Sequence, residues 1–79
     1  MSKPPIIRVE WIDTKGISNE WEMIDGIDPM LPCKCVSVGF LVDDHADYKT
    51  LAMTHAGDQV LGRMTIPTVA ITEMMTIIH

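Results

Sequence analysis

Residues 34–43 alternate between two kinds of side chain, and no other feature of the chain limits its fold as strongly. Two sets lie on opposite faces of an extended chain: Val36, Val38, Phe40 and Val42 on one, and Cys35, Ser37, Gly39 and Leu41 on the other. A period of two with many β-branched residues predicts a β-strand. Glycine inside a strand marks a bend, a bulge or the close approach of another backbone. We therefore expect a strongly curved strand centred on Gly39.

Other apolar segments share this pattern and are separated by turn signals. In residues 6–13, Ile7, Val9 and Trp11 fall on one face of an extended chain. The stretches "DDHAD" and "AGDQ" supply turn chemistry. Pro67 ends a strand, because proline removes a donor from the ladder. The predicted strands cover residues 6–13, 34–43, 48–55, 60–67 and 69–78.

The C-terminal segment also fits a second interpretation. Residues 69–78 contain apolar residues at helical spacing, and their Ala, Glu and Met favour helices. Thr68, Ile71 and Thr76 favour a strand instead. We expect a strand here, and a short helix remains the alternative.

Residues 14–32 form a long connection. Glycines, prolines and scattered acids interrupt it, and neither period persists. Loops of this length without structure of their own are uncommon in compact domains. We expect Trp21, Met23 and Ile24 to pin it over the core or to contribute a short extra strand.

The chain is expected to be one all-β domain over residues 1–79, a small five-stranded barrel of the SH3-like kind, closed or nearly closed. Closure removes unpaired strand edges. The residues expected to build its core include Trp11, Phe40, Leu51 and Met53. With 47% hydrophobic residues in 79, the chain has more apolar surface than so small a core hides. We therefore expect a homo-oligomer, with an interface that includes Met64, Ile66, Ile71, Met75 and Ile77.

Charge limits the partners. The net charge is −5, from 6 Lys and Arg against 11 Asp and Glu. This sign opposes the phosphate attraction behind most nucleic-acid affinity, so DNA is not expected as a partner, although a local patch could hold a small anion. No apolar signal segment or membrane-spanning run of about 18 residues is visible. These features predict a cytoplasmic protein with no membrane contact.

The two cysteines and three histidines form no recognised motif. A bridge between Cys33 and Cys35 would close a strained loop, so we expect reduced thiols. Together with His45 and His55 they lack the cysteine spacing of structural zinc sites. No nucleophile elbow or phosphate loop is present. The sequence predicts no metal, no cofactor and no enzymatic activity.

The stretch "VGFLVDDHADYKTLAM", followed by "IPTVAI" and a terminal apolar strand, resembles the layout of Sm-like proteins over residues 35–78. The combination of "VEWID", "SVGFLV" and "MTIP" is similar to small proteins of tailed phages and prophages. The resemblance implies a five-stranded barrel that forms a ring by pairing its fourth and fifth strands between subunits. It also implies RNA or nucleotide binding near the pore and, for a phage protein, a location in the host cytoplasm.

Within this resemblance, Asp44 matches the acid of the first Sm motif, Leu51 matches its apolar anchor, and Tyr48 lies near the position of the base-contacting Asn. Ile66-Pro67 replaces the Arg-Gly pair of the second motif. The predicted ligand-binding residues are Asp44, His45, Tyr48 and Lys49.

The same turn residues are also typical of a plain solvated hairpin. Our leading hypothesis is a non-enzymatic, ring-forming, Sm-like phage-type protein that binds RNA or a nucleotide at subunit junctions. The alternative is a protein–protein adaptor or an inhibitor of a host or defence protein.

Overall fold

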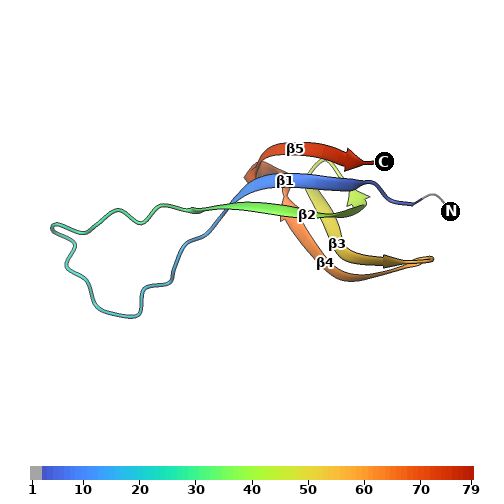
Figure 1. Cartoon of the computed structure of the whole chain (residues 1–79). Coiled ribbons are helices and arrows are strands. Elements are labelled where there is room, and N and C mark those ends of the chain that lie inside the picture. The colour runs from blue at the N-terminus through green and yellow to red at the C-terminus, as the bar shows by residue number, and fades with distance from the viewer. Residues whose placement is uncertain (1–2) are drawn as a thin grey trace.

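The computed structural model describes residues 3–79 and is built almost entirely from antiparallel strands (Figure 1). The elements are β1 (Ile6–Asp13), β2 (Cys33–Asp44), β3 (Tyr48–Ala56), β4 (Gln59–Pro67), the short 3₁₀ helix η1 (Thr68–Ala70) and β5 (Ile71–Ile78). The all-β prediction is confirmed, and the C-terminal segment is a strand and not a helix.

The five strands form a single curled sheet in the order β4-β3-β2-β1-β5. Each neighbouring pair is antiparallel. Among the described residues, β4 and β5 have only one neighbour each and do not pair with one another. The sheet is therefore open, and the fully closed barrel that we considered from the sequence does not form within one chain.

A small apolar core lies inside the curl of the sheet. Its centre consists of four buried side chains from β1, β3 and β4: Ile7, Val9, Leu51 and Ile66. Partly buried hydrophobic residues pack around them: Trp11, Leu41, Ala70 and Ile71. The predicted inward face of β1 is thus correct, and Trp11 adds a hydrogen bond from its Nε1 to the Ser37 hydroxyl at 3.0 Å.

Gly39 allows β2 and β3 to approach closely. A Cβ atom placed on Gly39 would lie 2.9 Å from the carbonyl oxygen of Ala52 and 3.3 Å from the Cβ of Leu51. Real Cβ atoms do not come that close to a backbone oxygen, so any side chain here would push the strands apart. The ladder between β2 and β3 then shifts register between Leu41 and Asp43. The expected close approach at Gly39 is confirmed.

Two residues assigned to the core from the sequence lie elsewhere. Gly39 faces the core beside Ile7, and the alternation of the strand therefore sends Phe40 to the opposite face. There the ring of Phe40 is half-buried against His55, with 5.5 Å between ring centroids. Met53 is 72% exposed, because it lies beyond the core and covers Gly62.

Residues 14–32, called the arm below, project away from the sheet (Figure 1). Every residue from 13 to 32 is exposed, and Trp21 is 103% exposed. The predictions that Trp21, Met23 and Ile24 pin this segment over the core, or form an extra strand, are therefore wrong. The reason is that the β1–β2 ladder continues to the pair Asp13–Cys33, which carries the connection past the end of the core.

The arm makes the molecule elongated. The chain measures 58 × 22 × 19 Å, and its radius of gyration is 16.6 Å. A compact chain of this length would have a radius of gyration of about 12 Å. Within residues 3–79, no helix is long and apolar enough to cross a membrane.

Gly39→Ala should lower the free energy of unfolding by about 1–3 kcal/mol, because the new methyl group meets the backbone of β3. Val69→Thr is the matched control, since Val69 is 97% exposed; it should change the free energy by less than about 0.5 kcal/mol. Urea denaturation measures both. Equal effects of the two substitutions would show that the close approach at Gly39 does not matter to stability.

Candidate functional site

The four predicted ligand-binding residues lie together in the turn between β2 and β3. The His45 ring stacks on the Tyr48 ring, with 4.5 Å between centroids and 27° between planes. The turn closes through a hydrogen bond from the His45 backbone N–H to the Tyr48 carbonyl at 3.0 Å. The Lys49 ammonium group donates to the Asp44 carboxylate and to the His45 carbonyl. Asp44, His45, Tyr48 and Lys49 thus form one cluster.

The electrostatics of this turn do not favour an anionic ligand. The side chain of Lys49 is only 15% exposed, and its charge already faces Asp44. His45 Nε2 lies 2.8 Å from an oxygen of Asp43, and Asp47 adds a further acid to the turn. The cluster therefore offers aromatic faces and carboxylate oxygens, whereas its one ammonium group is occupied within the turn.

The turn is also tied to one free edge of the sheet. Tyr48 is paired with Pro67 at the end of β4, and the Thr68 N–H donates to the Asp47 carbonyl at 2.9 Å. Any chain that paired with the free edge of β4 would therefore come close to this cluster.

The five residues predicted at an interface occupy different environments. Met64, Met75 and Ile77 are 40%, 49% and 47% exposed on the two edge strands. Ile71 is half-buried and packs against the core. Ile66 is buried at 1% exposure and belongs to the core, because its strand turns this residue inward; its side chain is not available on the surface of a single copy.

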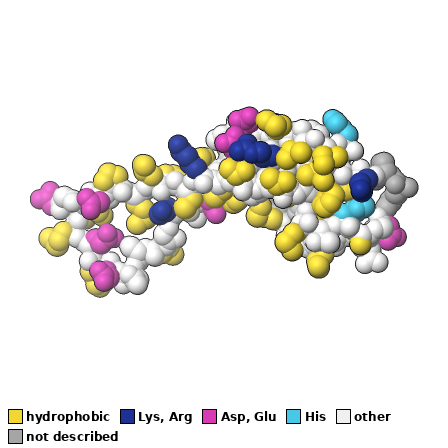
Figure 2. Space-filling model, in the orientation of Figure 1, with side chains coloured by type: hydrophobic (Ala, Val, Ile, Leu, Met, Phe, Trp, Pro, Cys, Tyr) yellow, Lys and Arg dark blue, Asp and Glu magenta, His cyan; other side chains and the backbone are white. Residues whose placement is uncertain are grey.

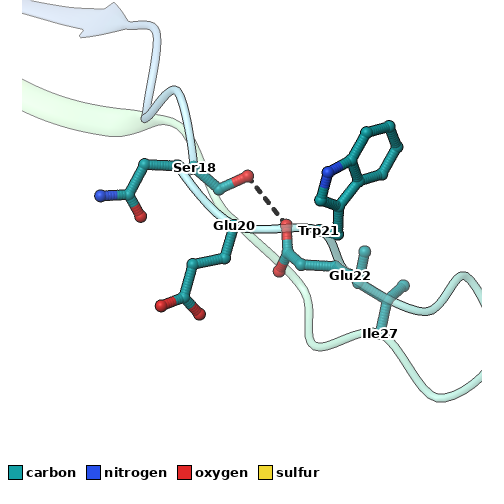
Figure 3. Close-up of a pocket in the computed structure, with 6 residues that line it drawn as sticks. Ser18, Glu20, Trp21, Glu22 and Ile27 are labelled. Atoms are coloured by element: carbon teal, nitrogen blue, oxygen red, sulfur yellow. Dashed lines mark hydrogen bonds between the residues drawn. The ribbon is translucent and has the colours of Figure 1, made fainter.

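Two further hollows were not predicted from the sequence, although some of their lining residues were assigned other places in it. One lies inside the curl of the sheet between β2, β3 and β4, and it is mostly apolar. Its lining includes Ser37, Leu51, Met53, Gly62 and Met64. The other lies on the arm, where the Ser18 hydroxyl donates to Glu22 at 2.8 Å and the ring of Trp21 stands beside them (Figure 3). All residues of the arm hollow are exposed, so it is open to solvent and has no buried wall.

A pair of carboxyl groups on β1 and β5 was also missed. Glu10 and Glu73 are direct cross-strand partners. The hydrogen bond that a protonated Glu73 would donate to Glu10 raises the pKa of Glu73, and the negative charge of Glu10 raises it further. The pKa of Glu10 is lowered by the same hydrogen bond and by Arg8, whose Nη1 lies 3.1 Å from Glu10. The strand register alone produces this pair, and the sequence pattern gave no signal for it.

The sulfur and imidazole groups do not meet. Cys33 and Cys35 are free thiols at the start of β2, where Cys35 lies opposite Trp11. His55 contacts Phe40 and His45 contacts Tyr48. Within the described part of the chain, no group of three or more Cys, His, Asp or Glu residues is placed to hold a metal ion.

Lys49→Met should lower the free energy of unfolding by about 1 kcal/mol, because it leaves the Asp44 carboxylate and the His45 carbonyl without their donor. Lys34→Met is the matched control, since Lys34 is an exposed lysine on β2. Urea denaturation of both variants measures the difference. An equal loss in the two variants would contradict a stabilising role for the Lys49 contacts.

Glu73→Gln should stabilise the protein at neutral pH, where two charged carboxylates face each other across the strands. Glu73 has a raised pKa in the fold, so its favourable contribution is complete below about 4.5 and is lost as the pH rises through the raised pKa. Glutamine imitates the protonated form. The melting temperature of the variant should therefore exceed that of the unmodified protein at pH 7, and the difference should disappear below the ordinary glutamate pKa. Asp58→Asn in the exposed turn between β3 and β4 is the control, and a pH-independent difference for Glu73→Gln would contradict the raised pKa of Glu73.

Comparisons with known proteins give no relative for this chain. No protein-family model matches it, and neither the curated proteins nor the solved structures contain a match. The Sm-like layout therefore stays a resemblance of the sequence alone.

Proposed function

We propose that this protein is a non-enzymatic protein-binding module that acts as a homo-oligomer, with β4 of one copy pairing with β5 of the next. One observation carries the proposal: the sheet order leaves β4 and β5 at the two edges. Each edge strand, of 9 and 8 residues respectively, presents a row of backbone groups without a strand partner. Long free edges of this kind readily pair with another chain.

The side chains of the edge strands support the same contact. Met64 on β4 and Met74 on β5 point into the curl of the sheet opposite Leu51 and Val9, yet they are 40% and 42% exposed. A strand added at either edge would extend the core over these methionines. Burial of a methionine side chain is worth about 1.5–3 kcal/mol.

Pairing between two different edges joins copies head to tail. Such a contact gives a closed ring if the rotation between copies closes, and a filament if it does not. The Sm-like layout of the sequence favours the ring.

The partner of this oligomer is proposed to be a protein with a basic surface. Each copy has a net charge of −5, and assembly multiplies that charge. The carboxylates of Asp43 and Asp47 are exposed in the turn, and Lys49 is engaged with Asp44. Charge complementarity mainly raises association rate and specificity. An adaptor, or an inhibitor of a host or defence protein, fits these properties.

A second candidate function is the binding of a nucleotide or a short RNA at the subunit junction. The observation in its favour is the stacked pair His45–Tyr48 beside the end of β4. Aromatic faces stack on nucleobases without needing a positive charge. Mass spectrometry of small molecules released from the purified oligomer distinguishes the candidates, since a stoichiometric nucleotide would favour this function over the adaptor.

The double variant Leu61→Lys, Met64→Lys should lower the mass of the protein in solution from that of the unmodified oligomer towards the 8.8 kDa of one copy, because edge pairing is lost. Both residues lie on β4 and are 67% and 40% exposed, so lysines there place like charges on the pairing edge. Light scattering measures the mass, and circular dichroism checks that the sheet is retained. Thr54→Lys on the interior strand β3 is the control and should keep the oligomer. An unmodified protein that is monomeric at high micromolar concentration would overturn the proposal.

A further inference from the structure

We infer that the arm of one copy covers the outer sheet face of a second copy, where Val36, Val38 and Met75 surround Arg8. The inference deepens the proposed function by naming a contact between copies, and it rests on the homo-oligomeric part of that proposal. Among these residues only Met75 lies on a strand of the edge pairing, β5, so the two contacts can be tested separately through Val38 and the arm.

The arm is rich in apolar side chains, and they are exposed to solvent in a single copy. Seven large hydrophobic residues within it are between 52% and 103% exposed: Ile17, Trp21, Met23, Ile24, Ile27, Met30 and Leu31. A contiguous exposed apolar surface of this kind marks an interaction site. Figure 2 shows these side chains along the projecting end of the molecule, with acidic side chains between them.

The surface area indicates how much is covered on assembly. The chain exposes 6446 Å², whereas a compact folded chain of 8.8 kDa exposes about 4,800 Å². The excess of roughly 1,650 Å² per copy lies within the range that one subunit buries in an obligate homodimer, about 1,000–2,500 Å². A second copy of the chain is therefore an occupant of sufficient size.

The outer face of β5, β1 and β2 supplies the complementary surface on the same chain. Arg8 is paired with Val38 on one side and with Met75 on the other, so the three side chains form a row across the sheet. Val36, Val38 and Met75 are 55%, 58% and 49% exposed. In Figure 2, hydrophobic side chains lie beside basic ones over β1 and β5, and acidic side chains adjoin the basic ones there.

Apolar contact, and not charge, matches the arm to this face. The arm carries four acids, Glu20, Glu22, Asp25 and Asp28, against Lys15 alone, a net charge of −3. Two of these acids flank Trp21, the most exposed of the large apolar side chains. Arg8 is already paired with Glu10 at 3.1 Å, so what it offers the arm is the flat face of its guanidinium group, on which an indole ring can stack. Because every copy has both an arm and a face, two copies related by a two-fold axis would exchange arms.

The environment of Trp21 tests the inference. The full-length protein is labelled with 5-fluorotryptophan, and its two fluorine resonances are assigned with Trp21→Phe. Access of a soluble paramagnetic gadolinium chelate to each indole is then measured. At high micromolar concentration, Trp21 should be several-fold less accessible than in the diluted monomer. Trp11 is half-buried against the core and should change little.

Variants locate the contact. Val38→Lys should restore full access to Trp21, whereas Thr54→Lys should leave it protected. If Val38→Lys does not fold, Ile24→Lys replaces it, since Ile24 lies on the arm outside the sheet and is 90% exposed; this variant should also restore access.

Three results would overturn the inference: an accessible Trp21 in an assembled protein, a protected Trp21 in a chain with the mass of a monomer, or protection that survives both sets of variants. The variant Leu61→Lys, Met64→Lys separates the two contacts between copies. If this variant is a dimer with Trp21 protected, the arm contact forms without the edge pairing. If the unmodified protein is larger than that dimer, both contacts are present in it.

Discussion

The close contact between Gly39 and the backbone of β3 underlies the whole arrangement. Gly39 allows the Ala52 carbonyl to approach to a distance that excludes a side chain. The sheet can then curl enough for Val9 on β1 to meet Leu51 on β3 and Ile66 on β4. A flatter sheet would separate these residues and leave both faces open to water. The core therefore depends on one residue that contributes no side chain to it.

The curl also sets the limit of what one chain can bury. The fully buried apolar residues in the described chain number five: Ile7, Val9, Leu51, Ala52 and Ile66. The methionines of the edge strands and the apolar residues of the arm have no place inside so small a core. Their exposure is the physical reason for proposing contacts between copies, at the sheet edges and along the arm.

Polar groups near the ends of the sheet interact with one another within the fold, and these interactions affect its stability. In the β2–β3 turn, Lys49 satisfies Asp44 and the His45 carbonyl, so the turn is stable without a ligand. The Glu10–Glu73 pair has the opposite character, because two acids face each other across the strands and the pKa of Glu73 is raised as a result. This pair lies on the same outer face as Arg8, and its charge state would affect any contact made there.

The sequence by itself determined where the strands lie, because alternation and turn residues set the backbone conformation through neighbours along the chain. Examples are the strand over residues 34–43, the "DDHAD" turn and the strand that ends at Pro67. The sequence also brought Asp44, His45, Tyr48 and Lys49 together, since a tight turn leaves them no other place. Only the tertiary structure decided which face of β2 is inside, because the close packing at Gly39 selects the small residues and turns Val36 and Val38 outward. The positions of Trp21, Phe40 and the Glu10–Glu73 pair likewise depended on register and on the end of the core, which are set by contacts between residues far apart in the chain.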